Sequence, residues 1–381
     1  GMRIVFDARA VQDRSDGMSN YVRHLVTCLL TFDRANDYVL LLNRAFADEL
    51  RALSLLERPN VRPVVTRTPF MGLSQQLAIP WLLRRYAPAD VYHYPHFDMP
   101  GWAHPRSVVT IYDLNHLRLP GYFDSQRQLK RIYSAAATRW SLAKARQIIA
   151  ISHETKSQLL QSFPSLDPAR ITVIYFGLNE RFHAKPGEAA VQRFREKFGL
   201  GHDRFILYVG TDRPHKNLDR LLLAYAKLRA QSGLTQKLLL VGGVRHDVRI
   251  QQRVAAAGVN GSVAHLGYLP EDELPLAYQV ADVFAFCSVS EGFGMPLLEA
   301  MASEVPIVTS RVGATAEIAG QSAILVDPFS VDSIAEGLFT MLTSQEARRQ
   351  RIAQGRVTVK QFSWEAAARQ TLEVYKSVGQ A

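Results

Sequence analysis

Residues 283–301 constrain the fold of this chain more than any other stretch. The first four, 283–286, form an apolar run with the composition of a buried parallel strand. A loop with two glycines follows, and then Pro296, which suits the first turn of a helix because the N–H that proline lacks would have no partner there. Strand, loop and helix in this order predict a βα unit.

The loop of this unit has the features of an anion site. Gly292 and Gly294 allow the backbone to approach a ligand closely. The first N–H groups of a helix lack intrahelical partners and attract phosphate. We therefore expect the free N–H groups of Met295, Leu297 and Leu298 to face a bound phosphate.

Two carboxylates accompany this anion site. Glu291 precedes the predicted helix, and Glu299 lies about one turn inside it. A sugar nucleotide carries both phosphate and hydroxyl groups, and an ionised carboxylate accepts hydrogen bonds from a diol. The pair therefore indicates a sugar nucleotide, although taken alone it also fits a solvated loop acid and an acid on a helix face.

The stretch 288–301 resembles the two-glutamate signature of the retaining glycosyltransferases of family 4, also called group 1. The resemblance covers nearly all of the second half of the chain and the first half more loosely. It continues through 306–310, Gly313, Glu317, 325–328 and 362–365. It implies the GT-B fold, an α/β architecture in which two Rossmann-like, doubly wound parallel-sheet domains face each other across a cleft.

The length of 381 residues also predicts two domains. Short β-rich runs alternate with helical segments in both halves, which favours parallel sheets covered by helices on both faces. We place an acceptor-side domain at 1–178, a linker at 179–200 and a nucleotide-sugar-binding domain at 201–363. The resemblance implies that a closing helix, 364–378, packs back onto the first domain.

Composition narrows the classes of partner. Most of the net charge of +10 falls in residues 1–178. Such a half suits an anionic membrane surface or a phosphate-bearing acceptor, with a solvated arginine-rich surface as the alternative. The cations do not cluster with aromatic residues in a nucleic-acid-binding motif, so we expect no nucleic acid.

The cysteines and the hydropathy pattern narrow the location. Cys28 and Cys287 are the only cysteines, and both lie in apolar patterns, which argues against a disulfide framework or a zinc site and fits a reducing cytoplasm. No stretch has the roughly 18 unbroken apolar residues of a membrane span. We expect a cytoplasmic protein that contacts the inner membrane face only peripherally.

The predicted second domain supplies most of the donor site. Arg213 and Lys216 lie between a strand end and a helix start, where cations meet a diphosphate; ordinary surface charges are the alternative. By resemblance, Glu299 holds the ribose, Glu291 holds the transferred sugar, and the backbone near Tyr268 holds the nucleobase. The complete predicted donor site comprises Gly17, Gly210, Arg213, Lys216, Tyr268, Leu269, Glu291, Gly292, Phe293, Gly294, Met295, Pro296, Leu297 and Glu299.

The first domain resembles the family less closely at its site. Gly17 is the one glycine kept from the family's glycine loop, and Tyr112 occupies the place of a histidine that lies near the transferred sugar in relatives. The predicted catalytic residues are Glu291, Lys216, Arg213 and Tyr112. The predicted acceptor-side residues follow two strands, and no third metal ligand lies near the histidines among them; these residues are His93, His96, Asp113 and His116.

These features predict a retaining, metal-independent hexosyltransferase. It would move a hexose from a nucleotide-diphosphate sugar, with GDP-mannose favoured, to a saccharide or polyprenyl-linked acceptor in surface polysaccharide or lipopolysaccharide biosynthesis. The sequence contains no Asp-x-Asp pair to bridge a metal to a diphosphate, so we expect neither a metal nor a further cofactor. Two alternatives remain: a catalytically silent nucleotide-sugar-binding partner subunit, and a GT-B nucleotide-sugar epimerase.

Overall fold

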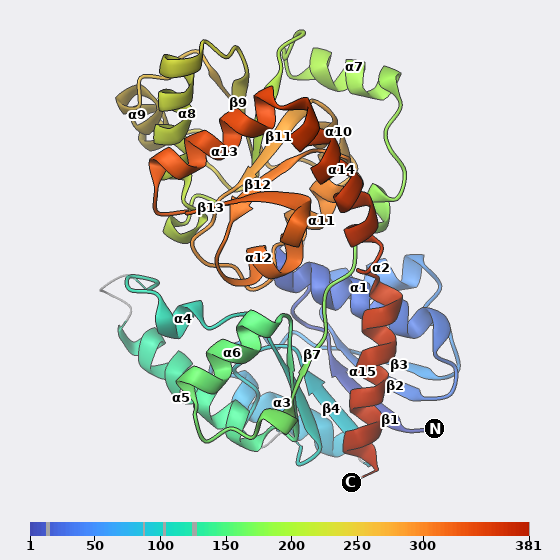
Figure 1. The fold of residues 1–381 in the computed structure, drawn as a ribbon. Helices are drawn as coiled ribbons and strands as arrows, with labels where there is room; N and C mark the ends of the chain where they lie inside the picture. The colour runs from blue at the N-terminus through green and yellow to red at the C-terminus, as the bar shows by residue number, and fades with distance from the viewer. Residues whose placement is uncertain (13–15, 87, 102–103, 124–127, 381) are drawn as a thin grey trace. The chain divides into compact units, whose positions relative to one another are not determined.

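The computed structural model describes residues 1–12, 16–86, 88–101, 104–123 and 128–380. The chain divides into two compact units (Figure 1). The first unit combines Gly1–Gly177 with Ser363–Ala381, and the second is Leu178–Phe362. The first unit is therefore discontinuous in sequence, because the C-terminal helix belongs to it.

The first unit contains a seven-stranded parallel sheet in the order β3-β2-β1-β4-β5-β6-β7. Strand order reverses between β1 and β4, which makes the carboxyl ends of these strands the topological switch point. The strands are β1 (Arg3–Asp7), β2 (Asp37–Leu42), β3 (Val61–Val65), β4 (Val91–Tyr94), β5 (Ser107–Ile111), β6 (Gln147–Ala150) and β7 (Ile171–Val173).

Side-chain caps begin several helices of this unit. The side chains of Asp16, Asn43, Ser152 and Ser363 each accept a backbone N–H in the first turn that follows them. The helices are α1 (Gly17–Phe32), α2 (Arg44–Ala52), α3 (Gln75–Arg85), α4 (Asn115–Arg118), α5 (Gln128–Lys144), α6 (His153–Ser162), the short η2 (Pro168–Arg170) and α15 (Trp364–Gly379).

A buried histidine joins α15 to the sheet. His93 lies within β4, and its Nδ1 is 2.6 Å from the hydroxyl of Tyr375 on α15. Its Nε2 is 2.7 Å from the hydroxyl of Thr110 on β5. Burial lowers the pKa of His93 to about 3, so the ring is neutral. The prediction that His93 contacts an acceptor is wrong, because the ring is inaccessible and both of its nitrogens are bonded within the first unit.

The second unit contains a six-stranded parallel sheet in the order β10-β9-β8-β11-β12-β13. Its strands are β8 (Phe205–Val209), β9 (Lys237–Val241), β10 (Val263–Gly267), β11 (Ala281–Phe286), β12 (Ile307–Ser310) and β13 (Ala323–Val326). The apolar residues of the four inner strands, β8, β9, β11 and β12, are mostly buried, as expected for a parallel sheet covered on both faces, whereas the edge strands β10 and β13 are partly exposed.

Helices connect the strands of this sheet. They are α8 (Leu218–Ser232), α9 (Val248–Ala256), α10 (Leu274–Gln279), α11 (Met295–Ala302), α12 (Gly313–Ala319), α13 (Val331–Thr343) and α14 (Gln345–Val359), with the short helices η4 (Pro214–Lys216) and η5 (Gly320–Ser322). Across the described ranges, no helix combines the length and the apolar character that crossing a membrane requires.

The predicted linker 179–200 has regular structure of its own. It contains η3 (Glu180–Phe182) and α7 (Glu188–Lys197), and it belongs to the second unit. Phe182 packs edge-on against Tyr278, with ring centroids 5.6 Å apart, and Phe194 is buried. The stretch predicted as a linker is thus structured, because two aromatic side chains anchor it.

The approach of Gly177 to α15 generates a stability prediction. A Cβ atom on Gly177 would lie 2.2 Å from the backbone nitrogen of Trp364, so the start of α15 would have to move. Gly177→Ala should lower the stability of the first unit by about 1–3 kcal/mol, the usual cost of overpacking. Urea unfolding followed by near-ultraviolet circular dichroism measures this loss.

Gly187→Ala is the matched control, because a Cβ atom there meets nothing within 4 Å. If both variants unfold at the urea concentration of the unmodified protein, the close packing of Gly177 against α15 is disproved.

Candidate functional site

The candidate site of the second unit lies where β8 and β11 end. These two strands are parallel neighbours, and the strand order reverses between them. Ligands of open α/β sheets bind beyond the carboxyl ends of strands at such a switch point. The predicted residues Lys216 and Glu291 follow these two strands.

Lys216 and Glu291 contact each other directly. The Nζ atom of Lys216 is 2.5 Å from Oε1 of Glu291, and the hydroxyl of Ser288 donates to the same oxygen at 2.8 Å. The side chains of Lys216 and Glu291 are only 19% and 12% exposed. The ammonium also lies 5.5 Å from the ring centroid of Phe286. The structure thus brings together a cation and a carboxylate that we had assigned to separate parts of a ligand.

Asn217 fixes the loop that carries Lys216. It is buried, has a left-handed φ of 65°, and donates from its side-chain amide to the carbonyls of Cys287 (2.8 Å) and Pro328 (2.7 Å). The N–H of Val289 donates to the carbonyl of His215 at 2.8 Å. These bonds tie together the loops that follow β8, β11 and β13. Asn217 is a positioning residue that was absent from the predicted site, although its place next to Lys216 was a signal.

Helix α11 begins at the expected point. Gly294 precedes it with a φ of 97°, a conformation that favours glycine, and a Cβ atom there would lie 3.0 Å from Leu297. The N–H of Leu297 donates to the carbonyl of Gly294 at 3.0 Å. The expectation that this N–H is free is therefore wrong, because the first turn of the helix already uses it. Phe293 is buried against Phe362, with ring centroids 5.8 Å apart.

Glu299 is buried one turn into α11. The hydroxyl of Tyr278, on α10, donates to its Oε2 at 2.6 Å. Burial raises the pKa of Glu299 to about 7, and the hydrogen bond from Tyr278 opposes this shift. The carboxyl therefore titrates near neutral pH. Tyr278 was missed at the sequence level because no motif links it to Glu299.

Glycines bring the strand ends of β8 and β9 close together. The N–H of Gly210 donates to the carbonyl of Val241 at 3.0 Å, and a Cβ atom on Gly242 would lie 2.5 Å from the carbonyl oxygen of Gly210. Tyr268 and Leu269 follow the edge strand β10, and the Tyr268 side chain is 61% exposed. Their predicted contact with the nucleobase stays a prediction.

Arg213 lies on the same loop as Lys216. It is exposed just before η4. Burial lowers the pKa of the neighbouring His215, and the charges of Lys216 and Arg213 add to this shift while Glu291 opposes it. Its predicted role at the diphosphate stays a prediction.

Tyr112 is the strongest candidate of the first unit. It directly follows β5, and its ring meets that of Tyr21 edge-on at a centroid distance of 5.4 Å. Its hydroxyl oxygen is buried, and no hydrogen-bond partner for it occurs in the part of the chain that the structure describes. Burial raises the pKa of Tyr112 well above its usual value, so the hydroxyl stays protonated. Gly17 begins α1 with open space where a Cβ atom would lie.

The remaining acceptor-side predictions fare differently. His116 is buried, its Nε2 lies 2.9 Å from the hydroxyl of Thr138, and burial lowers its pKa to about 4. It therefore packs largely within the first unit, and its predicted acceptor-side role stays a prediction. His96 is partly exposed with its Nδ1 2.9 Å from Asp98, and Asp113 accepts the N–H of Asn115 at 2.8 Å. Both stay predictions.

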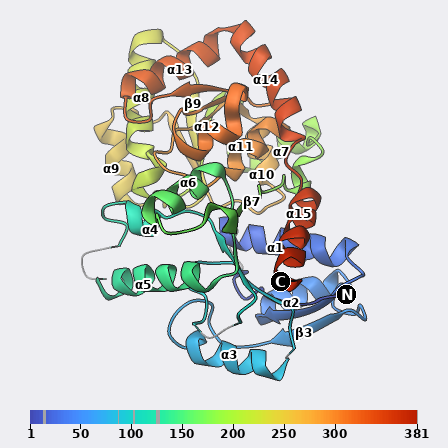
Figure 2. The same ribbon diagram turned by 60° about the horizontal axis from the view of Figure 1, so that its bottom comes forward.

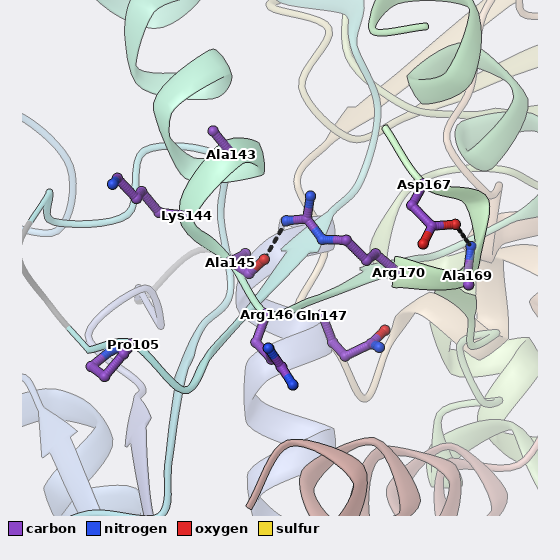
Figure 3. A pocket seen from close by; sticks show the side chains of 9 residues that line it. All are labelled: Pro105, Ala143, Lys144, Ala145, Arg146, Gln147, Asp167, Ala169 and Arg170. Atoms are coloured by element: carbon purple, nitrogen blue, oxygen red, sulfur yellow. Dashed lines mark hydrogen bonds between the residues drawn. The ribbon is translucent and has the colours of Figure 1, made fainter. Parts of the chain in front are cut away.

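A cavity of about 440 Å³ lies elsewhere in the first unit (Figure 3). It lies at the amino ends of β6 and β7, whereas the switch point lies at the carboxyl ends of the strands. Arg170 in its wall donates to the carbonyls of Leu142 and Ala145. Within the described ranges, no three His, Cys, Asp or Glu side chains gather to form a metal site.

The pKa of Glu299 generates a pH prediction. The native state keeps a proton between pH 4.5 and about 7 that the unfolded chain releases. Glu299 therefore makes the free energy of unfolding fall as the pH rises through this window. Glu299→Gln keeps an acceptor for Tyr278 and does not titrate. Its free energy of unfolding, relative to that of the unmodified protein, should therefore rise by up to about 3 kcal/mol as the pH rises from 4.5 to 7.

Urea unfolding at several pH values measures this difference. A stability difference between the two proteins that stays constant from pH 4.5 to 7.5 would show that Glu299 is ionised throughout.

Comparisons with known proteins identify relatives of both units. Residues 191–358 match the family described as "Glycosyl transferases group 1", and residues 15–182 match "Glycosyltransferase Family 4". The chain is 28% identical to O-antigen chain mannosyltransferase B of Escherichia coli, over 98% of this chain and 100% of that protein. It is 32% identical to an MMP alpha-(1→4)-mannosyltransferase of Mycolicibacterium hassiacum, over 60% of this chain and 54% of that protein.

Solved structures share the fold. Anabaena Alr3699/HepE in complex with UDP and glucose has a TM-score of 0.76 and 19% identity, over 99% of this chain and 100% of that chain. WaaG, a glycosyltransferase involved in lipopolysaccharide biosynthesis, has a TM-score of 0.73 and 16% identity, over 98% and 99%. The two parallel-sheet domains and these likenesses confirm the predicted GT-B fold. The chain belongs to the group 1, or family 4, glycosyltransferases.

Proposed function

We propose that this protein transfers a hexose, with retention, from a nucleotide-diphosphate sugar to a saccharide or lipid-linked acceptor. The observation that carries the proposal is the largely buried contact between Lys216 and Glu291 at the switch point, beside the start of α11. The names of relatives support a role in surface polysaccharide biosynthesis, since three of them are O-antigen or serotype-specific mannosyltransferases. The cytoplasmic face of the inner membrane is the proposed place of action.

The chemistry needs stabilisation of the leaving diphosphate as negative charge builds on it. Lys216 and the first turn of α11 supply a cation and a helix N-terminus that are already fixed in place, so little reorganisation is needed during the reaction. Glu291 would accept hydrogen bonds from the transferred sugar, and its contact keeps Lys216 oriented. Glu299 would accept the ribose hydroxyls. Tyr112 would donate one hydrogen bond to the substrate from its protonated hydroxyl.

GDP-mannose is the proposed donor. The mannosyltransferase relatives favour mannose. The structural neighbour from Anabaena was solved with UDP and with UDP-glucose, so uracil rather than guanine is the base bound by that protein. The two bases therefore form the decisive comparison.

A thermal-shift panel of GDP, UDP and ADP, each with its common sugars, tests the donor. A bound nucleotide raises Tm in proportion to RT ln(1 + [L]/Kd), so GDP-mannose should give the largest rise. A preference for UDP would remove mannose from the proposal. Turnover of the donor with and without acceptor extract then separates transfer from epimerisation and from binding alone, because only an epimerase converts the donor without an acceptor.

Lys216→Ala tests the role of the cation. Because Lys216 should stabilise charge that develops in the transition state, the variant should lose about 100-fold or more in kcat. The Kd of the variant for the donor should change less than tenfold, because Lys216 is expected to bind the transition state more strongly than the ground state. Lys227→Ala is the matched control, because Lys227 lies on α8 and pairs with the exposed Asp332. Unchanged turnover in both variants would place Lys216 outside the mechanism.

Metal-independent transfer is part of the proposal. The cation and the helix N-terminus would neutralise the diphosphate without a bridging ion. Activity should therefore survive an excess of EDTA. A loss of activity that added Mn²⁺ or Mg²⁺ restores would contradict this.

A further inference from the structure

Helix α3 exposes an apolar stripe. Leu73 and Leu77 are 75% and 72% exposed, and Trp81 is 63% exposed. They recur every four residues, so they lie along one face of the helix and the turn before it. The opposite face carries the buried residues Gln75 and Ile79. Three large apolar side chains in a row on a solvent-facing stripe are more than the scattered exposure of an ordinary surface.

Helix α5 exposes a second stripe. Leu129 is 83% exposed, Ile132 65% and Trp140 43%, with the exposed Ala136 between them. The spacing places these four residues on the outer face of the helix, whereas Ser134, Thr138 and Ser141 are buried.

Hydrogen bonds hold the two helices side by side. Gln76 of α3 donates to the hydroxyl of Tyr133 on α5 at 3.4 Å and accepts the N–H of Gly101 at 2.7 Å. The indole of Trp140 donates to the carbonyl of Gly101 at 3.1 Å. Figure 2 shows both helices on the same side of the first unit. We call the two stripes and the cations beside them the α3/α5 surface.

The charge of this surface has one sign. Residues 66–89 and 128–153 contain no Asp or Glu. The exposed cations of the two helices themselves are Arg84 and Arg85 at the end of α3, and Lys130, Arg131, Arg139 and Lys144 on α5. The ammonium of Lys144 lies 4.9 Å from the ring centroid of Trp140. Apolar and basic side chains thus alternate without any neutralising carboxylate on either helix.

We propose that the α3/α5 surface docks this protein onto an anionic lipid bilayer. Leucine, isoleucine and tryptophan side chains enter the boundary between head groups and acyl chains, while lysine and arginine side chains meet the lipid phosphates. Charge complementarity selects this occupant, because a purely basic rim repels a second copy of itself and a neutral apolar partner leaves six cations unused. The biological use of this docking rests on the proposed function, because a lipid-linked acceptor lies in the membrane. The exposed side chains and the charge that support the docking do not depend on that function.

Vesicle flotation of the full chain tests the docking. The protein should float with vesicles of phosphatidylglycerol and phosphatidylethanolamine and stay behind with phosphatidylcholine alone. Raised salt should weaken the binding. A triple variant, Trp81→Ser, Leu129→Ser and Ile132→Ser, should lose at least about tenfold in partitioning. Lys130→Glu with Arg131→Glu should lose at least as much, since each cation contributes about fivefold.

Val248→Ser and Arg245→Glu are the matched controls. Both residues are exposed on the second unit. The two variants should therefore bind vesicles as the unmodified protein does. All substituted side chains are solvent-exposed, and unchanged circular dichroism and Tm confirm that the variants fold. The docking is disproved if the unmodified protein does not float, or if the triple variant floats equally well. Light scattering that shows a dimer dissociated by the triple variant would assign the surface to a second copy and also disprove it.

Nucleotide binding and sugar transfer to a water-soluble acceptor are measured separately on the same variants. They should be unchanged. If the unmodified protein binds nucleotide but not vesicles, the docking is refuted and the proposed function stands. If it binds vesicles but no nucleotide, the proposed function is refuted and the docking stands.

Discussion

The candidate site depends on the geometry of Asn217. Its left-handed backbone turns the chain between η4 and α8, and its amide donates to two carbonyls on loops far away in sequence. Those carbonyls are buried acceptors, and leaving each unpaired would cost about 1–3 kcal/mol. The position of Lys216 follows, because it immediately precedes this anchored residue. The contact with Glu291 follows in turn, since Asn217 and His215 both bind the loop that carries the glutamate.

The strands could be predicted well from the sequence. The predicted strand 283–286 lies within β11, because an apolar run that ends at a glycine-containing loop is visible locally. Helix α7 was missed, because its residues fall within the predicted linker. Phe194 is the only residue of α7 that is buried, so its sequence carries little amphipathic pattern. Most of its residues are charged or small, and the burial of one aromatic side chain, Phe194, anchors the helix.

The site was predictable in its residues but not in its contacts. Glu291 and Lys216 stand out by motif and position, yet they are 75 residues apart and no local pattern announces their ion pair. His93 shows the opposite failure. It stands near the end of a strand, where functional residues gather, but its partner Tyr375 is 282 residues away and turns it into a core residue. Sequence shows which side chains follow a strand, whereas burial depends on what packs over them.

The discontinuity of the first unit has a consequence for biosynthesis. The ribosome finishes the seven strands of this unit early, but α15 emerges only after the whole second unit, at about 5–20 residues per second. Until then, His93 lacks one of its two hydrogen-bond partners, and the apolar surface beneath α15 stays open. The second unit is continuous in the chain and can complete its core first. We infer that the first unit, although synthesised first, is the last to finish folding. A nascent chain stalled before residue 363 exposes an apolar surface that chaperones can bind.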